Sequence, residues 1–331
     1  MSNTEKEYRA VVNAIGASLL LFLILFHVLY GGVISMRNIL VAQFVDFDTV
    51  YIASELLCYA VYGIVFTLPV IFFCAITKGI NRNPIDLTLK MPKNHPGFSF
   101  IAIIFSGLAV IIASVYLNKF LIRVPPAASA DLFGNIKDIK PYAYALSFLG
   151  SAVIPAFVEE LLFRALIISS LKPYSRKGAV IVSTIAFGLM HQNPLQILYA
   201  TVAGVVLALV YLKTESIWCC IALHFANNFV SVLQSVAVSL FGEETVKEII
   251  VCVDIAVIVI GVIFGLILLT MSLKTKKETH TFCKGNPLLE QEEQLSARRI
   301  FSGVFFNPAV CLFAVISIGA TIVKGFEIYI M

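Results

Sequence analysis

Two adjacent carboxylates and an arginine lie inside a long apolar stretch of this chain, at Glu159, Glu160 and Arg164. A charge at the centre of a membrane helix costs about 2.5–3.5 kcal/mol on insertion scales, so such residues indicate a functional site with a partner for the charge. Glu160 and Arg164 are four residues apart, which places them on one helix face where they can pair. Glu159 is rotated by roughly 100° from Glu160 and is expected to keep its carboxylate available for chemistry.

Two of the five histidines lie in later apolar stretches at a comparable depth. Phe187 precedes His191 by one helical turn, so its ring is expected to pack against the His191 imidazole. His224 and Asn228 are four residues apart and are expected to project side by side. We expect these groups and Glu159 to form one polar pocket within the membrane. Each element alone has a structural explanation, because a membrane His or Asn often hydrogen-bonds across helices and a Glu–Arg pair can fix helix packing. Their combination indicates a site.

A carboxylate beside an imidazole can take a proton from water, and a second imidazole with a neutral amide can donate hydrogen bonds to the oxyanion of a tetrahedral intermediate. These groups therefore predict acyl transfer to water. The chain has no GxSxG, HExxH or Walker motif, so neither a covalent nucleophile nor ATP is indicated. Glu159, His191 and His224 are also the ligand types that hold catalytic zinc. The sequence leaves open whether the site uses no cofactor or a divalent metal such as zinc.

The composition predicts a polytopic membrane protein. Hydrophobic residues make up 59% of the chain and charged residues 13%, and the mean hydropathy is +0.93. We expect an all-α bundle of about eight or nine transmembrane helices around a polar intramembrane cavity. Nine apolar stretches are candidate spans, near 11–35, 51–77, 99–121, 142–170, 178–192, 195–212, 217–240, 249–273 and 306–329.

The fifth of these stretches is short. It covers about 15 residues, or roughly 22 Å of helix, against a hydrocarbon core of about 30 Å. It ends at Asn193 and Pro194, because proline disfavours helix through the residue before it. A helix break at membrane depth is tolerated only against protein or water, so we expect wet space beside His191. In the fourth stretch, Pro155 leaves the carbonyl of Ser151 without its helical donor, which predicts a kink ahead of Glu159.

Loop charges predict the orientation. With the N-terminus in the cytosol, 16 of the 24 Lys and Arg residues are cytosolic, within 6–9, 78–93, 172–177, 213 and 274–299, and nine spans place the C-terminus outside. The net charge of +4 reflects these loops and does not indicate nucleic acid as a partner. The expected regions are N-terminal membrane helices over 1–141, a catalytic core over 142–240, and C-terminal helices over 241–331 with a basic cytosolic linker at 274–300.

Three motifs in successive membrane helices resemble the CPBP intramembrane protease family. They are Glu159-Glu160-x-x-x-Arg164, Phe187-x-x-x-His191 and His224-x-x-x-Asn228. This family includes the CAAX prenyl endopeptidases and the bacterial Abi proteins linked to bacteriocin processing, and it is usually described as metalloprotease. The resemblance covers about residues 142–240.

The resemblance implies a role for each residue. Glu159 would activate water together with His191, His224 and Asn228 would form the oxyanion site, and Glu160 with Arg164 would support the geometry. The implied partners are membrane lipid and a peptide or lipidated protein substrate, either CAAX-like or of the bacteriocin type. The implied location is a membrane, the bacterial plasma membrane rather than the endoplasmic reticulum, with the site facing the cytosol.

Two other functions remain open from the residues. The first is a non-catalytic bacteriocin immunity or scaffold protein, although such a protein would be expected to have lost Glu159 or a histidine. The second is a proton-coupled transporter, for which Glu, His and Arg at mid-membrane are equally natural. The sequence shows no internal repeat, which many transporters carry.

Overall fold

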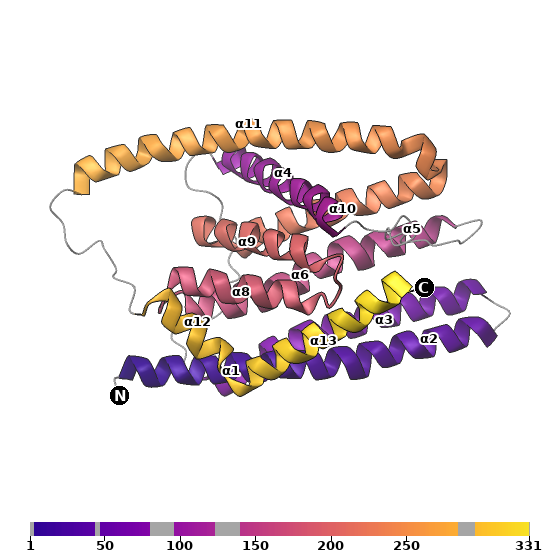
Figure 1. Ribbon diagram of the computed structural model, residues 1–331, viewed down its shortest axis with the longest axis horizontal. Helices are drawn as coiled ribbons and strands as arrows, with labels where there is room; N and C mark the ends of the chain where they lie inside the picture. Colours follow the sequence, from indigo (N-terminus) through magenta and orange to yellow (C-terminus); the bar gives the residue numbers. More distant parts are fainter. Residues whose placement is uncertain (1–2, 44–46, 80–95, 123–139, 284–294, 331) are drawn as a thin grey trace.

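The computed structural model describes residues 3–43, 47–79, 96–122, 140–283 and 295–330, and every regular element among them is helical (Figure 1). The predicted all-α membrane bundle is therefore confirmed. The elements are α1 (Asn3–Leu25), η1 (Phe26–Tyr30), α2 (Gly31–Gln43), α3 (Phe47–Ile76), α4 (Pro96–Ile122), α5 (Pro141–Phe148), η3 (Leu149–Val153), α6 (Ile154–Glu160), η4 (Leu161–Ile168), α7 (Ser169–Leu171), α8 (Arg176–Met190), α9 (Ile197–Thr214), α10 (Ile217–Phe241), α11 (Glu243–Cys283), α12 (Ala297–Phe305) and α13 (Pro308–Ile330).

Seven helices among the described residues are long and apolar enough to cross a membrane, which makes this an integral multi-pass membrane protein. They match seven of the nine predicted spans. The other two are the helical run from Pro141 to Leu171, which carries three charged side chains near its centre, and α8, which has only 15 residues. Helix α11 continues into the segment expected to be a linker, and residues 284–294 of that segment lie outside the described residues.

The helical run from Pro141 to Leu171 alternates between α and π turns. The π-helix η3 ends at Val153, two residues before Pro155. It contains Ser151, whose carbonyl is left without its α-helical donor by the missing proline N–H. A second π-helix, η4, begins directly after Glu160 and contains Arg164. Single π turns inside α-helices occur frequently at functional sites. The carboxylates thus lie on a short α segment between two π segments.

Helix α8 ends where the sequence predicts. His191 is its C-terminal cap, and Gln192 has a φ of +47°, in the left-handed region that ends a helix. The Asn193 side chain then accepts a hydrogen bond from the backbone N–H of Leu195 at 3.0 Å, which forms a turn around Pro194. Helices α8 and α9 approach closely beside this turn, because a Cβ at Gly188 would lie 2.1 Å from Thr201 Oγ1.

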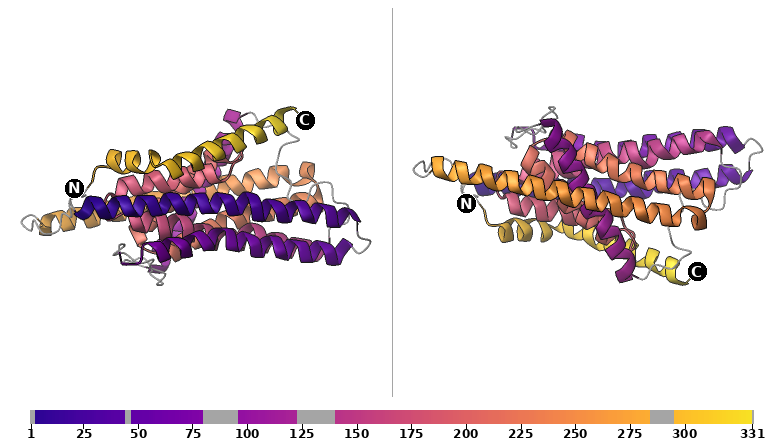
Figure 2. Two further views of the ribbon diagram at one scale, coloured as in Figure 1. Left: turned by 90° about the horizontal axis from the view of Figure 1, so that it is seen from below. Right: turned by 90° about the horizontal axis from the view of Figure 1, so that it is seen from above.

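The two ends of the bundle are distinct (Figures 1 and 2). At the end with the N-terminus, the Tyr8 hydroxyl donates to the carbonyl of Ile300 in α12 at 3.1 Å, and Lys172 Nζ lies 3.3 Å from a Glu215 carboxylate oxygen. At the opposite end, near the C-terminus, the Tyr142 hydroxyl donates to Asp48 at 2.6 Å. This arrangement agrees with termini on opposite sides of a membrane; which side is cytosolic stays a prediction.

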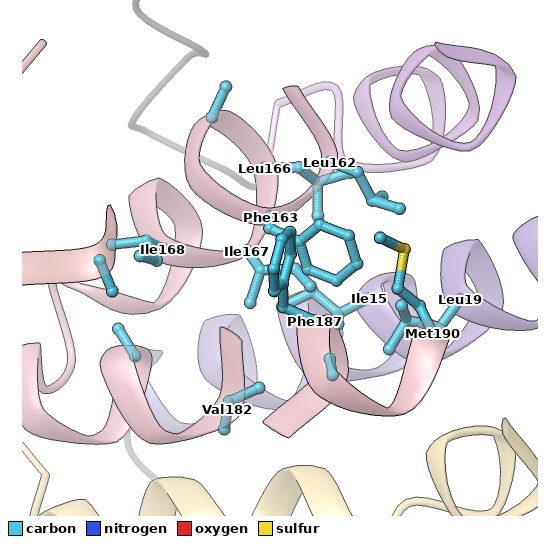
Figure 3. Packing of buried hydrophobic residues seen from close by; sticks show 14 of the residues in the cluster. Ile15, Leu19, Leu162, Phe163, Leu166, Ile167, Ile168, Val182, Phe187 and Met190 are labelled. Carbon is cyan, nitrogen blue, oxygen red and sulfur yellow. The ribbon is translucent and has the colours of Figure 1, made fainter. Parts of the chain in front are cut away.

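The apolar core lies directly against the segment that carries the charges. Leu162, Phe163, Leu166 and Ile167 are all fully buried and pack with Phe187 and Met190 of α8 and with Ile15 and Leu19 of α1 (Figure 3). Burial of this kind stabilises a membrane bundle mainly through close packing, because lipid tails are as apolar as the side chains. The core therefore fixes the depth and rotation of η4, and with it the position of the site.

Candidate active site

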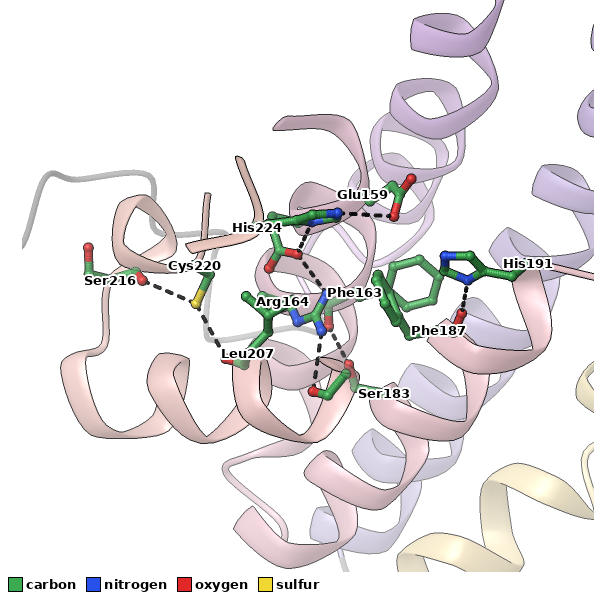
Figure 4. Close-up of polar contacts among 12 residues, drawn as sticks. Glu159, Phe163, Arg164, Ser183, Phe187, His191, Leu207, Ser216, Cys220 and His224 are labelled. Carbon is green, nitrogen blue, oxygen red and sulfur yellow. Dashed lines mark hydrogen bonds and ion pairs between the residues drawn. The ribbon is translucent and has the colours of Figure 1, made fainter. Parts of the chain in front are cut away.

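Three helical segments bring the predicted site residues together. Glu159 and Glu160 end α6, Arg164 lies in η4, and His224 lies on α10, and all four are buried, with exposed fractions of 4%, 0%, 0% and 6% (Figure 4). Helix α10 packs against both α6 and η4. The site is therefore assembled at the contact of two helical stretches that are distant in sequence.

The Glu160 carboxylate contacts both the Arg164 guanidinium and the His224 imidazole. Its Oε1 lies 2.8 Å from Arg164 Nη1, in the i, i+4 pair that the spacing predicts, and 2.9 Å from His224 Nδ1. Arg164 Nη2 also donates to the Gly204 carbonyl of α9 at 3.3 Å. The Arg164 guanidinium lies 4.5 Å from the centre of the Phe187 ring, which is a cation–π contact. Glu160 and Arg164 thus fix α6, α9 and the His224 ring relative to one another.

Glu159 has one oxygen bound and one oxygen open. Its Oε1 accepts a hydrogen bond from the Tyr62 hydroxyl of α3 at 2.7 Å. Its buried Oε2 has no hydrogen-bond partner among the described residues and lies 3.9 Å from His224 Nε2. The expectation of a wholly free carboxylate at Glu159 is therefore corrected: half of it is held by Tyr62. The open oxygen faces an imidazole nitrogen, which is the arrangement needed to share a water molecule.

His191 is oriented from the backbone of its own helix. Its Nδ1 lies 2.8 Å from the Phe187 carbonyl oxygen, and its ring packs edge-on against the Phe187 ring with centroids 5.1 Å apart. The predicted packing of the Phe187 ring against His191 is therefore confirmed. The same Phe187 ring lies 5.9 Å from the His224 ring, so one aromatic side chain separates the two imidazoles. The imidazole with a direct ion-pair distance to Glu159 is that of His224.

Asn228 lies one turn after His224 on α10, as predicted. Its side-chain oxygen accepts a hydrogen bond from Asn227 Nδ2 at 3.1 Å. With its oxygen engaged, the Asn228 amide nitrogen is the part of the side chain suited to donate to a substrate oxygen. Asn227 and Tyr62 are neighbours of the site to which sequence reasoning gave no role.

The candidate metal ligands do not form a complete metal site among the described residues. His191 and His224 each have Nδ1 engaged by an oxygen, as metal-bound histidines commonly do. However, no three His, Cys, Asp or Glu side chains in the described parts of the chain are arranged so that they could hold a metal ion. The ligand types at Glu159, His191 and His224 suit zinc, but their placement does not form a three-ligand set.

No pattern in the sequence marks Tyr62 as part of the site. It lies on α3, which is an ordinary apolar span, and Tyr51 and Tyr59 on the same helix look equivalent in the sequence. Only the packing of α3 against α6 and η4 distinguishes them.

Residues 141–230 match the family model described as type II CAAX prenyl endopeptidase Rce1-like. The chain is also 30% identical over 96 residues to the "Putative membrane peptidase YdiL" of Bacillus subtilis (strain 168). That alignment covers 28% of this chain and 38% of the length of YdiL. No solved structure matches the chain. The segment that carries Glu159, His191, His224 and Asn228 is thus similar to the CAAX prenyl endopeptidases, and the resemblance inferred from the three motifs is confirmed.

Proposed function

We propose that this protein is an intramembrane endopeptidase that hydrolyses a peptide bond with a water molecule activated by Glu159. One observation carries the proposal. The open oxygen Oε2 of Glu159 is buried and lies 3.9 Å from His224 Nε2, while the opposite nitrogen of that ring is held by Glu160 at 2.9 Å. The family match over residues 141–230 and the alignment with YdiL support a peptidase.

The catalytic step follows from these contacts. A water molecule between Glu159 Oε2 and the imidazoles gives a proton to Oε2, and its oxygen attacks the carbonyl carbon of the substrate. The substrate carbonyl becomes an oxyanion that accepts hydrogen bonds from the Asn228 amide and from Nε2–H of His224 in its imidazolium form, since Nδ1–H of this ring donates to Glu160. Stabilisation of the oxyanion is often the largest single contribution to catalysis of acyl transfer. The C–N bond then breaks, and the proton on Glu159 passes to the leaving amine. His191 assists the positioning of the water.

Glu160 and Arg164 have a supporting role in this scheme. They contact each other, His224 and the Gly204 carbonyl, and they are fully buried. Their position suits the orientation of the His224 ring, so that Nε2 rather than Nδ1 faces the open oxygen of Glu159. We propose that no resident metal is needed, because a base, an oriented imidazole and an amide donor are supplied by the chain itself.

The substrate class is a peptide at the membrane, either lipidated and CAAX-like or a bacteriocin-type precursor. A site enclosed by membrane helices suits a substrate that is already in the bilayer. The alignment with a Bacillus subtilis protein supports a bacterial plasma membrane, and the distribution of loop charges supports a site that is reached from the cytosol.

The test uses purified full-length protein in detergent, incubated with a farnesylated CAAX peptide and a panel of bacteriocin-like leader peptides, with products identified by mass spectrometry. Wild type is expected to cleave at least one peptide, and Glu159→Ala is expected to cleave none while it elutes as a folded monodisperse species. Cleavage by both proteins would contradict the role of Glu159. Binding of a peptide without cleavage by either would favour a non-catalytic immunity or scaffold protein.

A further inference from the structure

We propose that Tyr62, which lies outside the segment that matches the peptidase family, is a positioning residue that holds the Glu159 carboxylate in the rotation that points one oxygen, Oε2, at His224 and the attacking water. The inference rests on the proposed function of Glu159. It assigns part of the active centre to the N-terminal helices, which carry none of the three motifs.

The hydrogen bond fixes the plane of one carboxylate. Rotation about the last side-chain bond of a glutamate is broad, so the plane of an unrestrained carboxylate takes many angles relative to a substrate. In Glu159, the Tyr62 hydroxyl donates to Oε1 at 2.7 Å, within the short range of hydrogen bonds to charged acceptors. The other oxygen, Oε2, then points towards His224 Nε2, at 3.9 Å. Tyr62 therefore sets the angle at which the carboxylate meets the water.

The Tyr62 ring is itself fixed by an aromatic cluster. Its ring lies 5.5 Å from Tyr30 in an edge-on contact and 4.8 Å from Phe66 in a tilted one. Phe66 is buried against Phe22 of α1, with ring centroids 4.9 Å apart. Each such pair adds about 0.5–1.5 kcal/mol beyond its buried area. The phenol is thus a rigid donor, and its hydroxyl has little freedom to leave Glu159.

The backbone of the first membrane span supports this cluster. The π-helix η1 covers Phe26–Tyr30, and the rings of Phe26 and Tyr30 stack at 5.4 Å. The extra residue of a π turn changes which side chains face a neighbouring helix, and such turns occur often at functional sites. In this span the π turn coincides with Tyr30, the residue whose ring contacts Tyr62.

The Tyr59 ring of α3 lies directly against the backbone of Gly150 in η3. A Cβ at this position would lie 2.1 Å from Cε1 of Tyr59, which is one turn before Tyr62 on α3. A larger residue at position 150 would therefore displace the Tyr59 ring, since 2.1 Å is far below any van der Waals contact. Gly150 thus accommodates the side chain that precedes Tyr62 by one turn.

The test is Tyr62→Phe, which removes the hydroxyl and keeps the ring. The matched control is Tyr116→Phe, because the Tyr116 hydroxyl also donates to a buried carboxylate at 2.7 Å, that of Asp254 on α11, outside the active site. Both variants lose one hydrogen bond to a carboxylate and should show similar small decreases in thermal midpoint. Steady-state cleavage of the peptide identified above is then measured for both.

We expect Tyr62→Phe to lower kcat by about tenfold to a hundredfold, the range for a lost hydrogen bond to a charged group, with KM changed by less than about twofold. Tyr116→Phe should keep the wild-type kcat. A purely structural role would leave the kcat of the folded Tyr62→Phe protein at the wild-type value, whatever its thermal midpoint. That result, or an effect on KM alone, would overturn the inference.

A second measurement checks the contact itself. Tyr62→Phe should lower the thermal midpoint in the wild-type background and have no effect in a Glu159→Ala background, because the partner of the hydroxyl is then absent. Equal decreases in both backgrounds would show that Tyr62 does not act through Glu159. If wild type is active and Tyr62→Phe behaves as Tyr116→Phe does, only this inference fails. If wild type cleaves no peptide, the proposed function fails first.

Discussion

His224 Nδ1 lies 2.9 Å from Glu160 Oε1, so the carboxylate next to the proposed base orients the imidazole that faces the base. The two adjacent glutamates thus address opposite nitrogens of one ring, since Glu159 Oε2 lies 3.9 Å from Nε2. Adjacent positions on a helix point about 100° apart, which is what allows two neighbouring acids to reach both sides of His224. Each of the two adjacent glutamates therefore faces a different nitrogen of the His224 ring.

Replacement of His224 should abolish most activity without unfolding the protein. We expect His224→Gln to lower kcat by about 10²- to 10⁴-fold, because the variant loses Nε2, the nitrogen that faces Glu159 Oε2 and donates to the oxyanion. His27→Gln is the control, because His27 is exposed in η1. Peptide cleavage at saturating substrate measures the effect. Wild-type kcat in a folded His224→Gln protein would remove His224 from the mechanism.

Removal of Arg164 should affect folding more than removal of Glu159. Arg164→Ala leaves the fully buried Glu160 carboxylate without its cation, which costs about 3–5 kcal/mol. Arg9→Ala is the matched control, since Arg9 forms an exposed i, i+4 pair with Glu5 at 3.3 Å, and exposed ion pairs contribute little to stability. The readout is the yield of monodisperse protein and its thermal midpoint. A normal Arg164→Ala protein beside an unfolded Glu159→Ala protein would reverse our assignment of the paired and the open acid.

The sequence predicted those parts of the site that depend on local spacing. The Glu160–Arg164 pair, the wall that Phe187 forms beside His191 and the end of α8 before Pro194 all follow from positions a few residues apart. The contacts of Glu160 with His224 and of Tyr62 with Glu159 join residues 64 and 97 positions apart. Such contacts depend on how helices pack, and apolar periodicity does not determine the rotation of one membrane helix against another.

The irregular backbone segments were also only partly predictable from the sequence. Pro155 predicted a disturbance ahead of Glu159, and η3 is found there. The π-helices η1 and η4 contain no proline, and nothing in their sequences distinguishes them from regular helix.

Chelation should leave the activity intact. The described residues offer no three-ligand arrangement, and the proposed mechanism uses a carboxylate, imidazoles and an amide of the chain. We expect elemental analysis of active, chelator-treated protein to show far less than one zinc per chain. About one zinc per chain, with activity lost on its removal and restored by its addition, would rule out the metal-free scheme.

The orientation in the membrane follows from the loop charges and can be measured directly. In a background without native cysteines, single cysteines at Ser2 and within 274–300 should react with an impermeant reagent only from the cytosolic side. A cysteine at Glu243, which is exposed at the start of α11, should react only from the opposite side. Labelling of the 274–300 segment only from outside would invert the topology and the side from which the site is reached.

The role of Glu159 is tested most directly by single-turnover cleavage with Glu159→Gln, which keeps the size of the side chain and a hydrogen-bond acceptor for Tyr62. The amide cannot accept the proton from water, so the cleavage rate should fall by about 10²- to 10⁴-fold while the thermal midpoint and peptide affinity stay near those of wild type. A Glu159→Gln protein that is folded, binds peptide and cleaves it within about tenfold of the wild-type rate would contradict water activation by Glu159.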